Sequence, residues 1–340
     1  MTVTDFCSKV LPASITPSKL EPSPPFTYCA VDYFGPFYIK ERRSVLKRYG
    51  VIFTCMASRA VHLEAANSMD TDSFINALRR FIAVRGPIRQ LRSDMGTNFV
   101  GAKKELEVFN DDKTRDYLLR QNCDYIEFNM NVPSASHMGG VWERQIRTVR
   151  TVLEGLLSSS GQQLDDESLR TLLYEAMAIV NGRPLTVNSL TDVTAVEPLT
   201  PNHLLHMNTK VVLPPPGEFQ REDLYLQKRW RRVQHLLSEF WKRWQREYLP
   251  TLQERQKWNS VKVDLQQGDI VIVKDKNLPR NKWSLARVEE TFPSADGLIR
   301  KARLCIASQQ LDSLGRRLEK PTFLERPVHK LVLLQKVSNS

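Results

Sequence analysis

The sequence predicts an α/β protein in two parts: a mixed sheet with flanking helices, then a long helical segment and a small all-β unit. Strand and helix patterns alternate from residue 28 to residue 180, and a proline-rich stretch, Val212–Gly217, comes after them. Four short apolar strands near the end of the chain are the third observation. The expected boundaries are an irregular lead-in at 1–24, the α/β core at 25–187, a Pro-rich linker at 188–217, a basic Trp-rich helical segment at 218–260 and a β-barrel at 261–336.

Charge divides the chain in a similar way. The net charge is +11, and residues 201–340 hold 26 Lys and Arg against 15 Asp and Glu, so the first 200 residues are balanced. This division favours chemistry in the first part and polyanion binding in the second. Nucleic acid is the expected polyanion, because no long apolar run or signal-peptide pattern points to a membrane. The five cysteines are scattered without a CxxC pair, so we predict no zinc site and no disulfide framework.

Three strands are expected to open the core as a β-meander: Tyr28–Phe34, Tyr49–Met56 and Ala60–Ala65. Gly35-Pro36 is predicted to end the first of them. Asp32 interrupts an otherwise apolar run in that strand. A buried aspartate without a partner is costly, so Asp32 should be paired or should bind a metal. The alternative is that Asp32 faces solvent on an edge strand.

Asp94 is the second carboxylate in an unusual position. A helix with capping residues from Ser68 should stop at Gly86-Pro87, and the short strand Ile88–Arg92 leads directly to Asp94. Ligand sites gather at strand ends in α/β sheets, which favours a functional role. The alternative is a simple turn formed by Asp94 and Gly96.

The third carboxylate lies on a helix that begins after Gly139-Gly140. Glu143, Arg147 and Arg150 stand at i, i+4 and i+7, so they share one helix face, opposite a core stripe that includes Val149. On an isolated helix this spacing would indicate a surface Glu–Arg pair. Read together with Asp32 and Asp94, it predicts a three-carboxylate metal site beside a basic face. The remaining core elements are expected to be helices at 97–109, 112–122 and 165–180, and a fifth strand at 124–128.

The last third of the chain is basic and aromatic. A helical pattern runs from Phe219 towards Trp258 and should kink or end at Pro250. The strands expected after it form a small β-barrel, shaped like an SH3 or chromo domain, and they cover Gly268–Lys274, Ser284–Glu290, Leu298–Ile306 and Pro327–Leu334. Candidate phosphate-binding residues are Lys228, Arg229, Arg231, Arg232 and Lys274. The run from 228 to 232 also fits a nuclear import signal or a solvated helix face. His203 and His206 have the spacing of a metal pair, but without a third ligand we interpret it as incidental.

Three ordered stretches resemble the integrase catalytic core of BEL/Pao-type LTR retrotransposons: Pro25–Phe37, Arg92–Gly101 and Pro133–Glu143. The region Gly268–Leu334 and the helix before it look like the C-terminal domain that follows this core. The resemblance implies a ribonuclease-H-like core, with Asp32, Asp94 and Glu143 as the acidic triad that binds metal. It further implies that Asn98 and the loop containing His137 lie beside the site, and that Arg147 and Arg150 contact DNA.

The resemblance implies a chemistry as well. Two-metal phosphodiester cleavage at the element's 3′ ends would be followed by strand transfer into target DNA, with Mg²⁺ as cofactor and Mn²⁺ as a substitute. Mg²⁺ prefers carboxylate and water oxygens, so Asp/Asp/Glu is a suitable ligand set. The expected partners are double-stranded DNA and further copies of the chain, the expected location is the nucleus, and no membrane partner is expected.

The chain departs from the family pattern in two ways. Forty-eight residues separate Asp94 from Glu143, a longer spacer than in retroviral cores, and the His/Cys zinc module that precedes such cores is absent. We therefore expect a segment of a longer polyprotein. The alternatives are a non-catalytic DNA- or chromatin-binding protein derived from an integrase, and an RNA-cleaving ribonuclease H, which the basic C-terminal part disfavours.

Overall fold

The structure is a computed structural model, and it describes the chain in twelve stretches. These are residues 23–93, 96–107, 126–130, 140–160, 164–185, 200–206, 215–225, 228–251, 265–274, 282–294, 298–306 and 321–336. The expected lead-in therefore falls almost wholly outside the described residues. So do most of the linker and the helix expected at 112–122.

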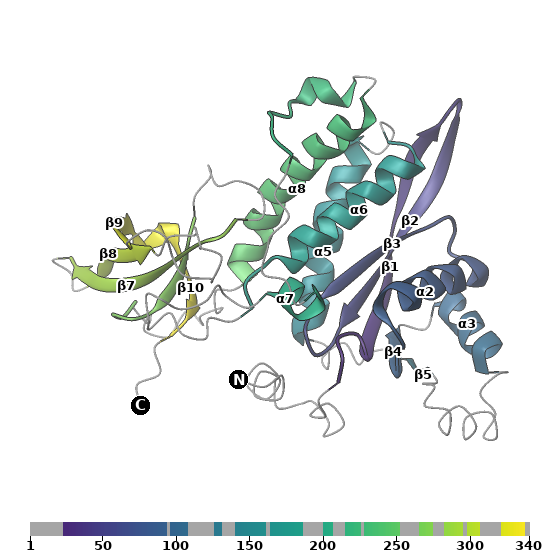
Figure 1. Ribbon diagram of the computed structural model, residues 1–340, viewed down its shortest axis with the longest axis horizontal. Helices are drawn as coiled ribbons and strands as arrows, with labels where there is room; N and C mark the ends of the chain where they lie inside the picture. Colours follow the sequence, from purple (N-terminus) through teal and green to yellow (C-terminus); the bar gives the residue numbers. More distant parts are fainter. Residues whose placement is uncertain are drawn as a thin grey trace. The chain divides into compact units, whose positions relative to one another are not determined.

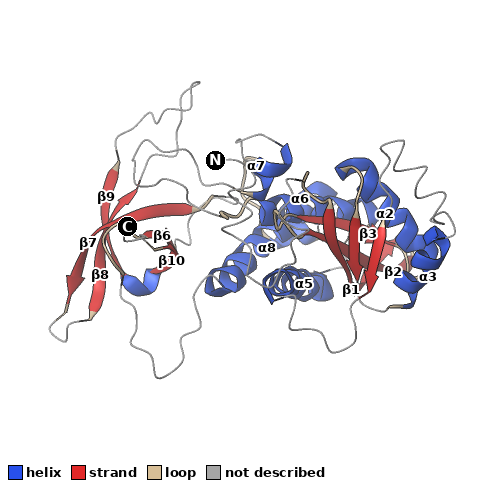
Figure 2. Cartoon of the chain, turned by 90° about the horizontal axis from the view of Figure 1, so that it is seen from below, coloured by secondary structure: helices blue, strands red, loops and turns tan. Residues whose placement is uncertain are grey.

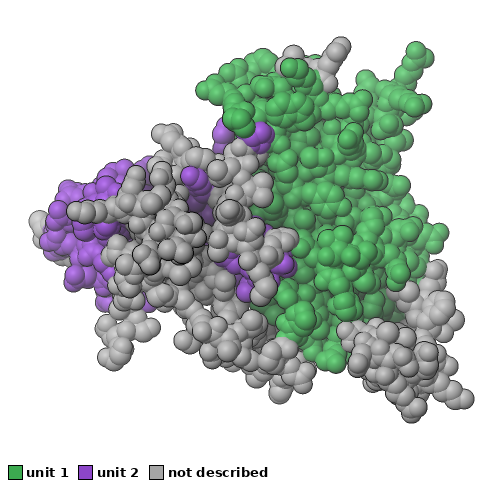
Figure 3. Space-filling view, in the orientation of Figure 1, with its two compact units in different colours: residues 1–181, 216–240 green, residues 182–215, 241–340 purple. Residues whose placement is uncertain are grey.

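The chain divides into two compact units (Figure 3). The first comprises residues 1–181 and 216–240, and the second comprises residues 182–215 and 241–340. The division falls inside one helix, α8 (Arg229–Thr251), whose first twelve residues cluster with the first unit. None of the helices in the described part of the chain has the length and hydropathy that crossing a membrane requires.

The first unit is built around a five-stranded mixed sheet, as the sequence predicts. Its strands are β1 (Tyr28–Glu41), β2 (Ser44–Cys55), β3 (Val61–Ala66), β4 (Gln90–Ser93) and β5 (Glu127–Met130). They lie in the order β3-β2-β1-β4-β5 (Figure 1). The pairs β1–β2 and β2–β3 are antiparallel, whereas β4 runs parallel to both β1 and β5.

Helices cover both faces of this sheet (Figure 2). They are α2 (Thr71–Arg85), α3 (Thr97–Glu107), α5 (Gly140–Ser160) and α6 (Asp166–Asn181). Consecutive residues of β1 show the two layers, because strand side chains alternate between faces. The Tyr33 ring packs on Phe74 of α2 and Phe99 of α3, whereas the Asp32 side chain is bonded to Arg150 of α5.

The predicted core stripe of α5 is confirmed. Val149, Val152, Leu153 and Leu156 are all buried, at 0–2% exposure. The periodicity of 3.6 residues per turn keeps these side chains on one side of the helix, so its opposite side carries the polar residues. Capping of α2 also follows the sequence: Asp70 accepts a hydrogen bond from the backbone N–H of Ser73.

The prediction that Gly35-Pro36 ends the first strand is wrong. β1 continues to Glu41 and pairs with β2 as far as the Glu41–Ser44 pair. The ladder shifts register between Phe34 and Phe37, so Pro36 occupies a bulge. A bulge accommodates proline, because no ladder hydrogen bond is required from its missing N–H.

Asn181, the last residue of α6, holds the outer edge of β3. Its side-chain oxygen accepts a 2.8 Å hydrogen bond from the backbone N–H of Val61. Its amide nitrogen donates one of the same length to the Val61 carbonyl. Asn181 is 1% exposed, so a side chain replaces a neighbouring strand at this point in a buried environment.

A polar cluster lies buried between β3, α2 and α6. His62 and Glu64 are 1% and 3% exposed and share a 3.0 Å hydrogen bond. Arg80 and Tyr174 also donate to Glu64, and Arg85 donates to the other ring nitrogen of His62. Burial lowers the pKa of His62 despite the bond to Glu64. Burial alone would raise the pKa of Glu64, but the hydrogen bonds from His62 and Arg80 outweigh it and the pKa is lowered.

The second unit contains a second five-stranded sheet, in the order β10-β6-β7-β8-β9, with every pair antiparallel. The strands are β6 (Ile270–Val273), β7 (Ser284–Pro293), β8 (Ile299–Ile306), β9 (Thr322–Pro327) and β10 (Leu331–Gln335). Closure into a barrel is not confirmed, because β9 and β10 form the two edges within the described residues. The single strand expected at Pro327–Leu334 is wrong in its start, since the chain forms a 3₁₀ turn at Val328–Lys330 between β9 and β10.

Removing the Asn181 side chain should destabilise the first unit. We expect Asn181→Ala to cost about 2–4 kcal/mol of unfolding free energy, because two buried backbone groups of Val61 lose their partner. Chemical denaturation measures this loss. Asn67→Ala is the matched control, as Asn67 is exposed just after β3 and should change stability little. A destabilisation equal to that of the control would contradict the edge role.

Stability of the first unit should fall as the pH drops below about 6.5, the ordinary His value. The folded state binds a proton at His62 less readily than the unfolded state does, so acidification favours unfolding. The contribution of Glu64 is present above its ordinary pKa and is lost as the pH falls through its lowered one. Thermal melts between pH 5 and 8 test this. His62→Gln should flatten the upper part of the profile, and an unchanged profile would contradict the assignment.

Candidate active site

Asp32 lies in the middle of β1, between buried neighbours. Val31 and Tyr33 are 4% and 7% exposed, whereas the Asp32 side chain is 31% exposed. The pattern noticed in the sequence therefore corresponds to a carboxylate that reaches the surface from a buried strand. β1 is the central strand of its sheet, and Asp32 pairs with Ile52 of β2. The ladder between β1 and β4 is described from Tyr28 to Ala30, two residues before Asp32.

A cation already faces Asp32. Nη1 of Arg150 donates to Oδ2 of Asp32 at 2.8 Å, and Nε of Arg150 lies 3.8 Å from Oε1 of Glu154. Glu154 also accepts a 3.3 Å hydrogen bond from the backbone N–H of Gly35. The guanidinium is thus held between two carboxylates, one from the strand and one from its own helix. Glu154 was not recognised in the sequence, although it stands at i+4 from Arg150.

This ion pair is weak enough for another cation to replace it. Arg150 and Asp32 keep 38% and 31% of their side chains exposed. Pairs of this kind contribute at most about 1 kcal/mol, because water screens the charges. The Asp32 carboxylate, with Arg150 as its counter-ion, therefore remains accessible to a competing cation.

The other two predicted ligands, Asp94 and Glu143, lie wholly or partly outside the described residues. Asp94 lies outside the described residues and directly follows Ser93, the last residue of β4. Glu143 belongs to the first turn of α5, but its side chain lies outside the described part. Among the side chains that the structure describes, no group of three His, Cys, Asp or Glu forms a metal site. Asp32 is among these described side chains, whereas those of Asp94 and Glu143 are not.

Helix α5 relates Glu143 to the ion pair. Residue 143 precedes Arg150 by two turns, about 10 Å along the axis. The two residues share one face of the helix. Arg147, on the same face, is exposed. Of the two arginines predicted to contact DNA, Arg147 therefore points to solvent, and Arg150 is engaged by Asp32.

The candidate phosphate-binding residues of the basic segment differ in their contacts. Arg229 pairs with Asp165 at 2.7 Å, and Arg231 pairs with Asp223 at 2.7 Å. The hydrogen bonds with Asp223 raise the pKa of Arg231. These two guanidiniums stabilise the first unit, where all four residues belong.

The other candidates follow no single pattern. Lys228 and Lys274 are exposed, and Arg232 is half-buried. The Asn98 side chain and all of His137 lie outside the described part of the chain.

The two histidines with metal-pair spacing lie on a short helix, α7 (Pro201–His206). Nδ1 of His203 accepts a 3.1 Å hydrogen bond from the backbone N–H of Thr200. His203 therefore caps the start of its own helix, in keeping with an incidental spacing. The side chain of His206 lies outside the described residues.

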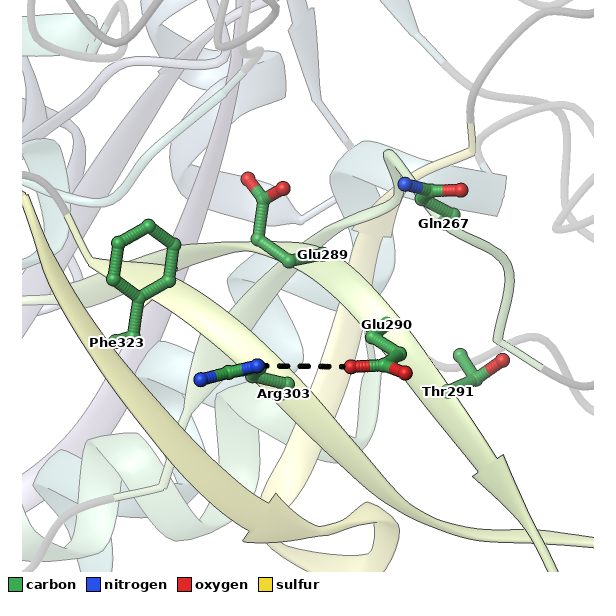
Figure 4. Close-up of a pocket in the computed structure, with 6 residues that line it drawn as sticks. All are labelled: Gln267, Glu289, Glu290, Thr291, Arg303 and Phe323. Atoms are coloured by element: carbon green, nitrogen blue, oxygen red, sulfur yellow. Dashed lines mark ion pairs between the residues drawn. The ribbon is translucent and has the colours of Figure 1, made fainter.

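The second unit has a groove on its sheet (Figure 4). Its volume is about 650 Å³, and its lining comprises Gln267, Glu289, Glu290, Thr291, Arg303 and Phe323. Arg287 bonds Glu289 at 2.5 Å, and Arg303 faces Glu290 at 3.8 Å. The carboxylates are therefore balanced by arginines within the unit, and the groove lacks the positive charge that a phosphate site needs.

Comparisons with known proteins give limited matches. Residues 228–334 match the model of a family of unknown function (DUF5641), which is less than half of the chain. No curated protein matches the sequence.

Two solved structures show similarity over much of the chain. One is the cryo-EM structure of the simian T-cell lymphotropic virus intasome in complex with PP2A regulatory subunit B56 gamma. The sequence identity is 13%, the match covers 93% of this chain and 81% of that chain, and the TM-score is 0.34. The other is the HTLV-2 integrase catalytic core domain in complex with magnesium. The sequence identity is 15%, the match covers 54% of this chain and 98% of that chain, and the TM-score is 0.32. Both scores are below 0.5, so neither superposition establishes a shared fold.

Replacing Arg150 should strengthen binding of a divalent cation at Asp32. We expect Arg150→Gln to raise Mn²⁺ affinity about fivefold, because a competing pair worth near 1 kcal/mol is removed. Titration calorimetry of the metal-free chain measures this directly. Arg147→Gln removes the same charge from the same helix without touching Asp32, so its affinity should stay near that of the wild type. Equal affinities in all three proteins would exclude Arg150 as the competing cation.

Proposed function

We propose that this chain is an integrase-type polynucleotidyl transferase, which cleaves at the 3′ ends of a DNA element and joins them to target DNA. Within that class we assign it to the BEL/Pao-type LTR retrotransposon integrases. The three motifs around Asp32, Asp94 and Glu143 support this assignment, since each carboxylate occurs within its own matched stretch.

One observation carries the proposal: the register between β1 and β4. Tyr28, Cys29 and Ala30 pair in parallel with Gln90, Leu91 and Arg92. The offset is constant, and the same offset links Asp32 with Asp94. Extended by that offset, the register would bring Asp94, which directly follows the end of β4, beside Asp32. Ligand sites in α/β sheets gather where parallel strands end.

Each residue of the proposed site would have a separate role. Asp32, Asp94 and Glu143 would hold Mg²⁺, which when bound neutralises charge on the attacking and leaving oxygens of a phosphodiester. Arg147, exposed on the same helix face, would bind DNA phosphate beside them. Arg150 would hold Asp32 in place before the metal binds and would then be released towards DNA.

The remaining assignments follow from this activity. Double-stranded DNA would be the substrate, and the exposed Lys228 and Lys274 would contribute non-specific phosphate contacts. A chain that joins two element ends to one target is expected to act as a homo-multimer. Work on chromosomal DNA would place it in the nucleus.

Substituting Asp94 should abolish the chemistry. We expect Asp94→Asn to reduce Mg²⁺- or Mn²⁺-dependent nicking and strand transfer on an element-end duplex by about 100-fold or more, since a metal contributes several kcal/mol of transition-state stabilisation. Gel assays of a labelled duplex measure both steps.

Asp72→Asn, an exposed carboxylate near the start of α2, serves as the charge-matched control and should retain activity. Equal activity of wild type and Asp94→Asn would refute the catalytic role. A wild-type chain that binds duplex DNA without cleaving it under either metal would favour the non-catalytic DNA-binding alternative.

A further inference from the structure

The β1–β2 hairpin runs beyond the rest of its sheet. β3 pairs with β2 only from Tyr49 to Thr54, and β4 pairs with β1 only from Tyr28 to Ala30. Residues 37–48 therefore pair only with each other in the described part of the chain, and they form a two-stranded ribbon (Figure 1). Here we call these twelve residues the hairpin arm.

The base of the hairpin arm is fixed to the core. Phe37 and Ile39 are buried, at 2% and 0% exposure. The backbone N–H of Lys40 donates to the Leu164 carbonyl at 2.9 Å. Arg48 makes two 2.7 Å hydrogen bonds to Asp166 at the start of α6. The arm is thus a supported projection, with one face packed on the core.

The opposite face and the tip are exposed and basic. Cross-strand pairing puts Tyr38 beside Lys47 and Lys40 beside Val45 on one face. All four side chains are exposed, with Tyr38 at 50% and Val45 at 56%. The side chains of Lys40, Arg42 and Arg43 make no hydrogen bond or ion pair with any described residue, in contrast to Arg48.

Charge is concentrated on this ribbon. Residues 37–48 hold five Lys and Arg and one Glu, a net charge of +4. The first 200 residues as a whole are balanced, so the remainder of that part carries a net charge of −4. The arm is therefore a basic projection from an otherwise acidic region. The balanced charge of the first 200 residues as a whole does not show this.

The tip of the hairpin arm carries an arginine at a position whose positive φ disfavours large residues. Arg42 and Arg43 form the two-residue loop between the paired residues Glu41 and Ser44, and Arg42 has φ = 56°. Loops of this kind favour Asn or Gly, because a larger L-residue at positive φ costs on the order of 1 kcal/mol. Local stability does not explain an arginine here, whereas a role for its charge does.

We infer that the hairpin arm binds the phosphate backbone of duplex DNA. A two-stranded β-ribbon has a width that the major groove admits, and exposed arginines at its tip can reach phosphates on both sides. Tyr38 and Val45 offer apolar contact next to the two lysines. Arg42 is ten residues beyond Asp32, which corresponds to about 30 Å along an extended chain, so the arm would contact DNA away from the reacting phosphate.

This inference rests on the proposed function only in taking DNA as the polyanion. The test measures the binding of a 30-base-pair duplex to the full chain by fluorescence anisotropy, at salt concentrations from about 50 to 300 mM. We expect Arg42→Asn with Arg43→Ser to weaken binding about three- to tenfold near 100 mM salt. The slope of log affinity against log salt should fall by about one to two.

Two further double variants serve as controls. Arg42→Lys with Arg43→Lys keeps the charge and should keep the salt slope. Arg79→Asn with Lys104→Ser removes the same charge from exposed positions of α2 and α3, and should change binding less than the tip variant. Thermal melts should show that Arg42→Asn leaves the fold as stable as the wild type or more so, because Asn tolerates a positive φ.

The outcomes separate this inference from the proposed catalytic activity. A tip variant with unchanged affinity and salt slope overturns the role of the arm, even if the wild type cleaves DNA. A tip variant that loses only self-association in sedimentation also overturns it. If the wild type binds duplex through the arm but Asp94→Asn and wild type react alike, the arm stands and the catalytic proposal fails. A wild type that does not bind duplex refutes both.

Discussion

Strand β1 is the constraint on which the first unit depends, because it is paired on both sides and covered on both faces. β2 and β4 hold it through antiparallel and parallel ladders. Alternation along the strand then sends Tyr33 to the layer of α2 and α3 and Asp32 to the layer of α5. A slip of one residue would exchange these two side chains, so the register that packs the core also directs the carboxylate.

Helix α5 joins core packing to the candidate site. Its buried stripe packs on the sheet, and the same periodicity places Arg150 at the flank of that stripe and Arg147 in solvent. The ion pair of Arg150 with Asp32 contributes little to stability because both groups remain partly exposed. A weak pair on a firmly held scaffold suits a site that must exchange one cation for another.

Sequence patterns predicted the core where the signal is local. Strong periodicity anticipated α2, α5 and α6, and Asp32 stood out as a carboxylate within an apolar strand. The hairpin arm was missed, because Gly35-Pro36 has the pattern of a strand end and only tertiary pairing reveals a bulge. β9 was missed for a similar reason: its six residues are mostly exposed, and they form a strand because they pair with β8. The contacts of Arg150 with Asp32 and of Asn181 with Val61 join residues about 120 positions apart, which no local pattern encodes.

The Asn181 contact has a consequence for how copies of this chain can associate. An exposed strand edge offers unpaired N–H and C=O groups to any extended segment nearby, which invites aggregation. At the start of β3 both groups of Val61 are already taken by a side chain of the same molecule. A strand from another copy therefore cannot add there without first displacing Asn181. The sheet is thereby protected from growth at this end of β3.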